Sequence, residues 1–299
     1  MTVADSTPDD TDRSSPIPAR TKPDSSIPGG ELAPGVEQMM IGASLLAASA
    51  NVIMQLAHPG VGHGVVESTV ESGQLYRHPV KRGRTTLTYL VVATLGTDRE
   101  RKLFQRDVNK AHAQVRSGSS SPVSYNAFHT DLQLWVAACL YKGVEDTLEL
   151  FGPPLTAEQR DRFYQEAARL GTTLQVPEHL WPSDRAEFER YWNASVEQIS
   201  IDDAVRDYLH DLAVLGFLPR YISRPLAPLH RFVTTGFLPP EFREQMRLPW
   251  GPRQQRRFDR LMSGIGAVVR RLPMPLRRFP YNLLLWDVRR RIRNGQPPV

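Results

Sequence analysis

Apolar and polar residues recur with a helical period along almost the whole chain beyond Gly35. Strict apolar–polar alternation over the length of a strand is hard to find. The pattern therefore predicts an all-α fold, built as one large helical domain over residues 35–299. A hydrophobic content of 40% is ample for the core of such a domain.

Start and stop signals place three of the expected helices. The first, residues 155–171, begins with a capping box in which Thr156 is followed three positions later by Gln159. Gly171 is its expected stop, because glycine commonly ends helices. Two further amphipathic helices are expected at residues 184–199 and 202–216.

Two segments are apolar on every side. Residues 39–57 include no charged residue over 19 positions, which approaches the length of a membrane span. Asn51, Gln55 and small residues spaced four apart favour a buried central helix instead. Residues 131–141 predict a second helix of this kind. The many prolines beyond residue 216 predict that residues 216–299 wrap around the domain in short pieces.

Composition separates the first 34 residues from the rest. Residues 1–34 hold six prolines, five serines and six acidic residues, so we expect a disordered tail. This segment has no basic start and no apolar run, so no secretory signal is expected. Cys139 is the single cysteine of the chain. One cysteine excludes an internal disulfide and a cysteine-based metal cluster, so a cytoplasmic protein is expected.

Positive charge is concentrated near the C-terminus. The formal net charge is +5 and the sequence pI is about 9.5. Residues 251–299 contain 12 arginines against two acidic residues, interleaved with leucine, phenylalanine, tryptophan and valine. Because this charge is local, nucleic acid is not an expected partner. The arginines fit a solvated basic face, a set of groups that hold acidic ligand atoms, or a peripheral contact with anionic lipid.

An arginine lies on the apolar face of the helix expected at residues 83–96. Arg84 and Thr88 share this face with two further residues, Val91 and Leu95. A desolvated guanidinium needs an anion, so Arg84 predicts an acidic partner. That partner belongs either to a ligand or to the protein, unless Arg84 is exposed in the first turn of the helix.

A histidine borders another buried face. His112 follows Val108 by four residues, beside the apolar face of a helix that contains Phe104, Ala111 and Val115. A buried imidazole needs hydrogen-bond partners or a metal, and a satisfied core histidine is the simpler alternative. A zinc site made of His58, His63 and His112 lacks any regular ligand spacing.

Several separated blocks of sequence, taken in order, resemble one known family. The blocks are QLAHPGVGHGVVEST, RTTLTYL, KAHAQVRSG, YNAFHTDLQLWVAACLYKG and the helix that follows LTAEQ. Together they resemble the haem-dependent oxygenases that include bacterial rubber oxygenases (latex clearing proteins) and the MpaB-type, ER-bound oxygenases of fungal meroterpenoid biosynthesis. The resemblance covers about residues 40–215.

The resemblance implies an all-helical fold that encloses haem b and an oxidoreductase that uses dioxygen on a lipophilic, prenyl-type substrate. In the family, the histidine matched by His112 is the proximal ligand of the haem iron. Arg84 and Thr88 match a pair of residues near the haem. Glu67, in the VVEST stretch, matches a carboxylate that serves as a base.

One departure from the family pattern concerns Leu87, which directly precedes Thr88. Rubber oxygenases carry at this place a lysine that can occupy the distal face of the iron, and leucine cannot ligate iron. The sequence is therefore more similar to the MpaB-like branch, and long-chain polyisoprene is not the expected substrate. Asp131 and Trp135 match a family helix that we interpret as structural.

Two other functions stay open at this stage. One is a non-catalytic helical protein at a membrane surface, which would use its arginines on anionic lipid and hold no metal. The other is a haem-binding protein without oxygenase activity.

Overall fold

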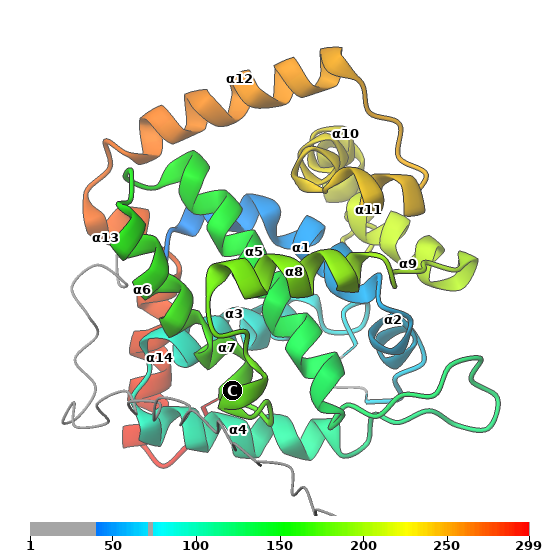
Figure 1. The fold of residues 1–299 in the computed structure, drawn as a ribbon, viewed down its shortest axis with the longest axis vertical. Helices are drawn as coiled ribbons and strands as arrows, with labels where there is room; N and C mark the ends of the chain where they lie inside the picture. The colour runs from blue at the N-terminus through cyan, green and yellow to red at the C-terminus, as the bar shows by residue number, and fades with distance from the viewer. Residues whose placement is uncertain (1–39, 71–73, 299) are drawn as a thin grey trace, which may run out of the picture. The chain divides into compact units, whose positions relative to one another are not determined.

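The computed structural model describes residues 40–70 and 74–298, which form helices joined by loops (Figure 1). The 3₁₀ helices are η2 (Gly42–Ala47) and η4 (Glu178–Leu180), and the α-helices are α1 (Ala48–Leu56), α2 (Pro59–Val66), α3 (Pro79–Leu95), α4 (Asp98–His112), α5 (Thr130–Phe151), α6 (Ala157–Ala167), α7 (Arg169–Thr172), α8 (Arg185–Val196), α9 (Asp203–Ala213), α10 (Arg220–Phe237), α11 (Pro240–Gln245), α12 (Pro252–Val269), α13 (Met274–Arg277) and α14 (Tyr281–Arg293). This part of the chain has no strand, so the predicted all-α fold is confirmed. The expected tail, residues 1–34, lies outside the described residues.

Capping residues start several helices, as the sequence predicts. At α6, the Thr156 hydroxyl accepts a hydrogen bond from the Gln159 amide, and the Gln159 side chain accepts one from the Thr156 amide. The helices α8 and α9 each follow an aspartate that caps the first turn. A second capping box, between Thr97 and Glu100, starts α4. Each such cap stabilises its helix by about 1 kcal/mol.

The expected helix stop at Gly171 is wrong. The helix α6 ends at Ala167, and Gly171 lies inside the short helix α7 that follows. A Cβ atom at Gly171 would lie 3.2 Å from Val176 and 3.3 Å from Ala137 of α5. Glycine is therefore placed here for close packing of α7 against α5, which the local sequence does not reveal.

The C-terminal part is less broken than its prolines predict. The helix α10 is 18 residues long and contains Pro225 and Pro228. These prolines free the carbonyl groups of Tyr221 and Arg224, both of which are exposed residues. Water can bond these carbonyls, so the helix continues. The helix α12 is also 18 residues long.

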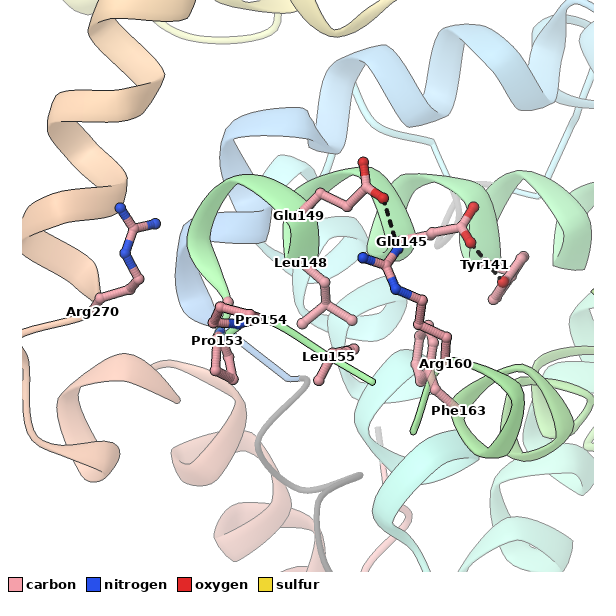
Figure 2. A pocket seen from close by; sticks show the side chains of 11 residues that line it. Tyr141, Glu145, Leu148, Glu149, Pro153, Pro154, Leu155, Arg160, Phe163 and Arg270 are labelled. Carbon is pink, nitrogen blue, oxygen red and sulfur yellow. Dashed lines mark hydrogen bonds and ion pairs between the residues drawn. The ribbon is translucent and has the colours of Figure 1, made fainter. Parts of the chain in front are cut away.

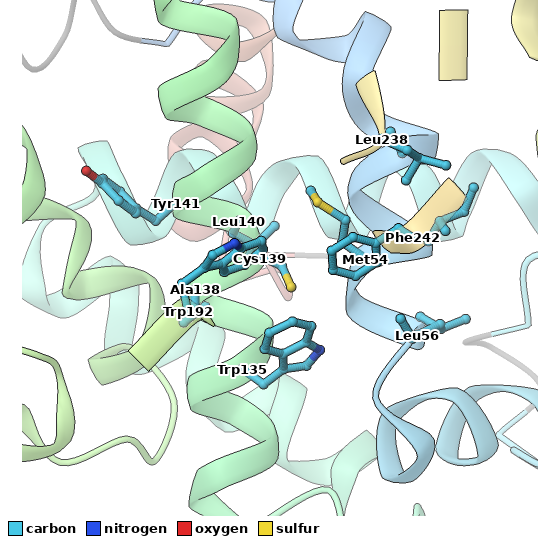
Figure 3. Close-up of a cluster of buried hydrophobic side chains, with 14 of the residues drawn as sticks. Met54, Leu56, Trp135, Ala138, Cys139, Leu140, Tyr141, Trp192, Leu238 and Phe242 are labelled. Carbon is cyan, nitrogen blue, oxygen red and sulfur yellow. The ribbon is translucent and has the colours of Figure 1, made fainter. Parts of the chain in front are cut away.

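The helix α5 runs through the middle of the fold and contacts η2, α1, α7 and α12 (Figure 1). The apolar segment 39–57 forms η2 and α1 rather than one continuous helix, and its predicted central position is confirmed by its packing against α5. Trp135 of α5 stacks on Trp192 and Phe242, with ring centroids 5.3 and 6.4 Å apart (Figure 3). No helix in the described part of the chain is long and apolar enough to cross a membrane.

A second, smaller core joins α3, α4 and α14. Val91 and Val92 of α3 pack there with Phe104 of α4 and with Tyr281 and Val288 of α14. All five side chains are buried. This cluster fixes the relative positions of α3 and α4, the two helices that carry most of the predicted site residues.

Candidate functional site

His112 is the last residue of α4. The helix runs from its capping box at Thr97, and Phe104 on its inner face is fully buried, which anchors the helix against the second core. The Nδ1 atom of His112 is buried and has no hydrogen-bond partner among the described residues. The expectation that His112 points toward the interior is therefore met, but the simpler alternative of a satisfied core histidine is not.

The surroundings of His112 favour a neutral ring. Burial and the nearby positive charge of Arg82 lower the pKa of His112 to about 4. The ring meets Phe128 edge to face, with centroids 6.3 Å apart. A neutral imidazole with an unpartnered nitrogen is the form of histidine that ligates iron.

The helix α3 turns Thr88 and Arg84 toward different surroundings. Thr88 is 1% exposed, and its Oγ1 atom has no hydrogen-bond partner among the described residues. Arg84 forms an ion pair with Asp287 of α14 and keeps about a third of its side chain exposed. The predicted acidic partner of Arg84 is thus a protein carboxylate, whereas Leu87 packs on the second core.

Arg82 is a site residue that the sequence analysis missed. Its side chain is accessible to solvent, yet it has enough protein around it for desolvation to lower its pKa. Its charge acts on His112 and on Tyr208 of α9, so it lies near both. It forms no ion pair within the described residues. Arg82 and Arg84 are two positions apart and so project about 200° from each other on a helix, and periodicity alone could not tell which one faces the site.

Glu67 belongs to a hydrogen-bonded network rather than standing free. Its Oε1 atom lies 2.7 Å from Nδ1 of His63, and its Oε2 atom accepts a 2.9 Å hydrogen bond from the Tyr125 hydroxyl. Ser121 also donates to Oε1. On the other side of the ring, Nε2 of His63 lies 2.7 Å from Oδ2 of Asp202, the residue that caps α9.

The His63 ring carries a positive charge in this arrangement. Burial opposes the charge, but the hydrogen bonds to Glu67 and Asp202 outweigh burial and raise the pKa of His63. Burial raises the pKa of Glu67, but the hydrogen bonds that Glu67 accepts from His63, Tyr125 and Ser121 outweigh burial and lower this pKa. Only an imidazolium can donate from both nitrogens at once, which both carboxylates require. The network therefore joins α2 to the start of α9.

A chain of amide side chains supports the helical turn that carries His112. The Gln175 side chain donates a 2.5 Å hydrogen bond to Asn109, three residues before His112. Gln133 of α5 is buried, donates to the Gln175 side chain and accepts from its backbone amide. These bonds tie the C-terminal turn of α4 to α5.

A cavity of about 500 Å³ opens beside the C-terminal end of α5 (Figure 2). Arg160 binds Glu149 at its wall, and Tyr141 donates to Glu145. Arg270, which directly follows α12, also lines it. None of the predicted site residues lines this cavity, so its size does not make it the candidate site. The chemistry points to His112.

The zinc alternative finds no support in residues 40–70 and 74–298, where no group of three or more His, Cys, Asp or Glu side chains could hold a metal ion. His58 instead caps α2, where its Nδ1 atom accepts a 3.2 Å hydrogen bond from the Gly60 amide. Cys139 is buried in α5, and burial raises the pKa of its thiol, as expected of a small apolar residue.

Comparison with known proteins places the chain in a family. Residues 38–267 match the family described as ER-bound oxygenase mpaB/B'/Rubber oxygenase, catalytic domain. The chain belongs to this family. Membership in the MpaB/rubber oxygenase family indicates an oxygenase-type enzyme and confirms the resemblance carried by the separated sequence blocks.

Similar chains occur in mycobacteria. The uncharacterized protein Rv2237 of Mycobacterium tuberculosis and the uncharacterized protein Mb2261 of Mycobacterium bovis are each 52% identical over 252 residues. The match covers 84% of this chain and 99% of each relative. No solved structure matches the chain. The matched region of the MpaB/rubber oxygenase family includes all four predicted site residues, which are Glu67, Arg84, Thr88 and His112.

Proposed function

We propose that this protein is a haem b-dependent oxygenase that uses dioxygen to oxidise a lipophilic, prenyl-type substrate. The observation that carries the proposal is the buried Nδ1 atom of His112, which has no hydrogen-bond partner among the described residues. Leaving this nitrogen unpaired costs about 1–3 kcal/mol, and a ligand bound to Nδ1 itself would remove that cost. Membership in the MpaB/rubber oxygenase family supports an oxygenase, and the cofactor and substrate are our proposal.

His112, its neighbour Arg82 and the buried Thr88 of α3 carry groups that suit a haem. The neutral His112 ring would bind the iron, and binding and activation of dioxygen is the chemistry that a haem supplies. Arg82 offers a positive charge to an anionic group beside His112, such as a propionate. The Thr88 hydroxyl has no protein partner and is free to donate a hydrogen bond to a bound group. Leu87 provides an apolar side chain that cannot compete for the iron.

Two of the four predicted residues are engaged by the protein itself. Arg84 already binds Asp287, so its part in the proposed site is to hold α3 against α14. Glu67 keeps its proposed role in proton transfer, but its lowered pKa makes it a weaker base. Accepting a proton at Glu67 would also disturb the charged pair with His63. We therefore place Thr88 and His112 first in the proposed chemistry.

The experiment is a titration of the purified chain with haemin, followed by absorption spectroscopy. The wild-type protein should develop a Soret band that saturates at one haem per chain, and His112→Ala should not. The matched control is His129→Ala, because His129 is exposed and lies in the loop before α5. Equal haem binding by the wild type and His112→Ala would overturn the assignment of the ligand.

A second titration tests Arg82. Arg82→Gln should weaken haem binding about tenfold, the effect of losing one charge-assisted hydrogen bond. Lys81→Gln removes the same charge from the neighbouring exposed position and should bind haem as the wild type does.

Oxygen consumption separates an oxygenase from a haem-binding protein. The haem-loaded chain, supplied with a reductant and a prenylated aromatic compound, should consume oxygen faster than without that compound. If the chain binds haem but no compound in a panel of this kind increases its oxygen uptake, the protein is a haem-binding protein and the proposed oxygenase activity is wrong.

A further inference from the structure

The helix α14 exposes an apolar face on the side opposite its packing contact. Tyr281 and Val288 are buried against α3 in the second core. Leu283, Trp286 and Arg290 follow one another at spacings of three and four residues, which places them on one face of the helix. All three are exposed, so this face of α14 has no partner among the described residues.

The same apolar character continues toward α13. We define the C-terminal apolar patch as Leu276, Phe279, Leu283 and Trp286, each of which is 51–60% exposed. Isolated apolar residues are common on protein surfaces, but four large ones within eleven positions are not. Trp286 differs from the buried tryptophans Trp135, Trp181 and Trp192, which are each at most 6% exposed.

The surroundings of this patch are strongly positive. Residues 270–293 contain eight arginines and one acidic residue, Asp287, whose carboxylate binds Arg84. The Arg290 guanidinium lies 5.5 Å from the centroid of the Trp286 ring rather than on a carboxylate. Near Leu276, the Nε and Nη2 atoms of Arg277 are buried and have no hydrogen-bond partner within the described residues. These two atoms are closed to solvent, so an external anion meets the exposed arginines, Arg290 among them, rather than this part of Arg277.

We propose that the C-terminal apolar patch and its arginines dock this protein on the surface of an anionic lipid membrane. Tryptophan, phenylalanine and leucine side chains enter the boundary between headgroups and acyl chains, while arginines bind lipid phosphates. The helices α13 and α14 follow one another along one side of the fold (Figure 1), and the four patch residues lie on these helices and on the turn between them. The docking is peripheral, and a membrane surface is also where a lipophilic substrate would concentrate.

Charge favours a membrane over a second copy of this chain. Pairing two copies through the same surface would bring two sets of arginines together with few carboxylates to neutralise them. Anionic lipid supplies the missing negative charge, at about a fivefold gain in binding for each arginine near the surface.

The test is co-sedimentation of the full chain with vesicles, compared between phosphatidylcholine alone and phosphatidylcholine mixed with phosphatidylglycerol. The mixed vesicles should bind the protein and blue-shift its tryptophan emission, and added salt should weaken the binding. The double variant L283S/W286S should lose at least tenfold in binding, and Arg290→Gln about fivefold. Because these positions are exposed, the variants should melt as the wild type does.

The controls change the same residue types elsewhere. L226S/L229S removes two exposed leucines from α10, and Arg99→Gln removes an exposed charge from α4. Neither variant should alter vesicle binding. The proposal is overturned if the wild type binds neither vesicle, or if L283S/W286S binds as well as the wild type. It is also overturned if, in lipid-free solution, the wild type is a dimer and L283S/W286S is a monomer, while vesicles bind neither protein. His112→Ala should bind vesicles as the wild type does, so this test is independent of the haem.

Discussion

Replacing His63 by leucine should destabilise the fold in a pH-dependent manner. The His63 ring is buried, and each of its nitrogens lies 2.7 Å from a carboxylate oxygen, one on Glu67 and one on Asp202. A hydrogen bond to a charged group contributes about 1.5–3 kcal/mol. The Asp202 side chain is 47% exposed, so solvent screening reduces its contribution.

The expected cost of His63→Leu is about 2–4 kcal/mol near pH 6. The two carboxylates keep other partners in the variant, because Tyr125 still donates to Glu67 and the Val205 amide still donates to Asp202. The loss is therefore that of the two bonds, without the larger penalty of an orphaned buried charge.

The pH dependence follows from the direction of the pKa shifts. The pKa of His63 is raised, so its contribution is complete below the usual value of about 6.5 and is lost as pH rises through the raised pKa. The pKa values of Glu67 and Asp202 are lowered, so their contributions are lost as pH falls below about 4. The cost of His63→Leu should be largest between about pH 5 and 6.5 and clearly smaller at pH 9.

Urea denaturation followed by circular dichroism, at pH 5.5, 7 and 9, measures this difference. His129→Leu is the control and should change the free energy of unfolding by less than about 0.5 kcal/mol, because the residue is exposed. A cost of His63→Leu that is constant from pH 5.5 to 9, or that grows with pH, would refute the charged state assigned to His63.

Three further experiments test other parts of the structure. Thr88→Val should raise the free energy of unfolding of the haem-free chain by about 1 kcal/mol, because the lost hydroxyl has no partner. The same substitution should weaken haem binding. A double-mutant cycle of Arg84→Met and Asp287→Asn should give a coupling of about 1 kcal/mol or less in urea denaturation, since both side chains are partly exposed. Gly236→Ala would place a Cβ 2.1 Å from the Phe258 ring, so thermal unfolding should show a loss of about 1–3 kcal/mol.

The sequence predicted the features that depend on near neighbours. The period of apolar residues was enough for an all-α fold, and the Thr156 and Gln159 pair was enough to start α6, since both signals lie within a few residues. The prediction that Gly171 ends this helix was wrong because the role of Gly171 is set by the close approach of Val176 and Ala137. Ala137 belongs to a different helix, so the local sequence carries no signal of it. Continuation of α10 through Pro225 likewise depends on solvent access at its exposed face.

The candidate site was predictable only in part, because its contacts join distant segments. The inward position of Thr88 followed from its helical face. An acidic partner of Arg84 was expected, but the choice between a ligand and Asp287 depends on how α14 packs against α3, 203 residues further along the chain. The pairing of His63 with Asp202 spans 139 residues and has no local signal.

The central claim, that His112 binds the haem iron, is tested most directly by removing the imidazole and supplying it again. His112→Gly would leave space for a free ligand, so we predict that the haemin-treated variant lacks the wild-type Soret spectrum and regains it on addition of imidazole. A His112→Gly protein that shows the wild-type haem spectrum without imidazole would contradict the account.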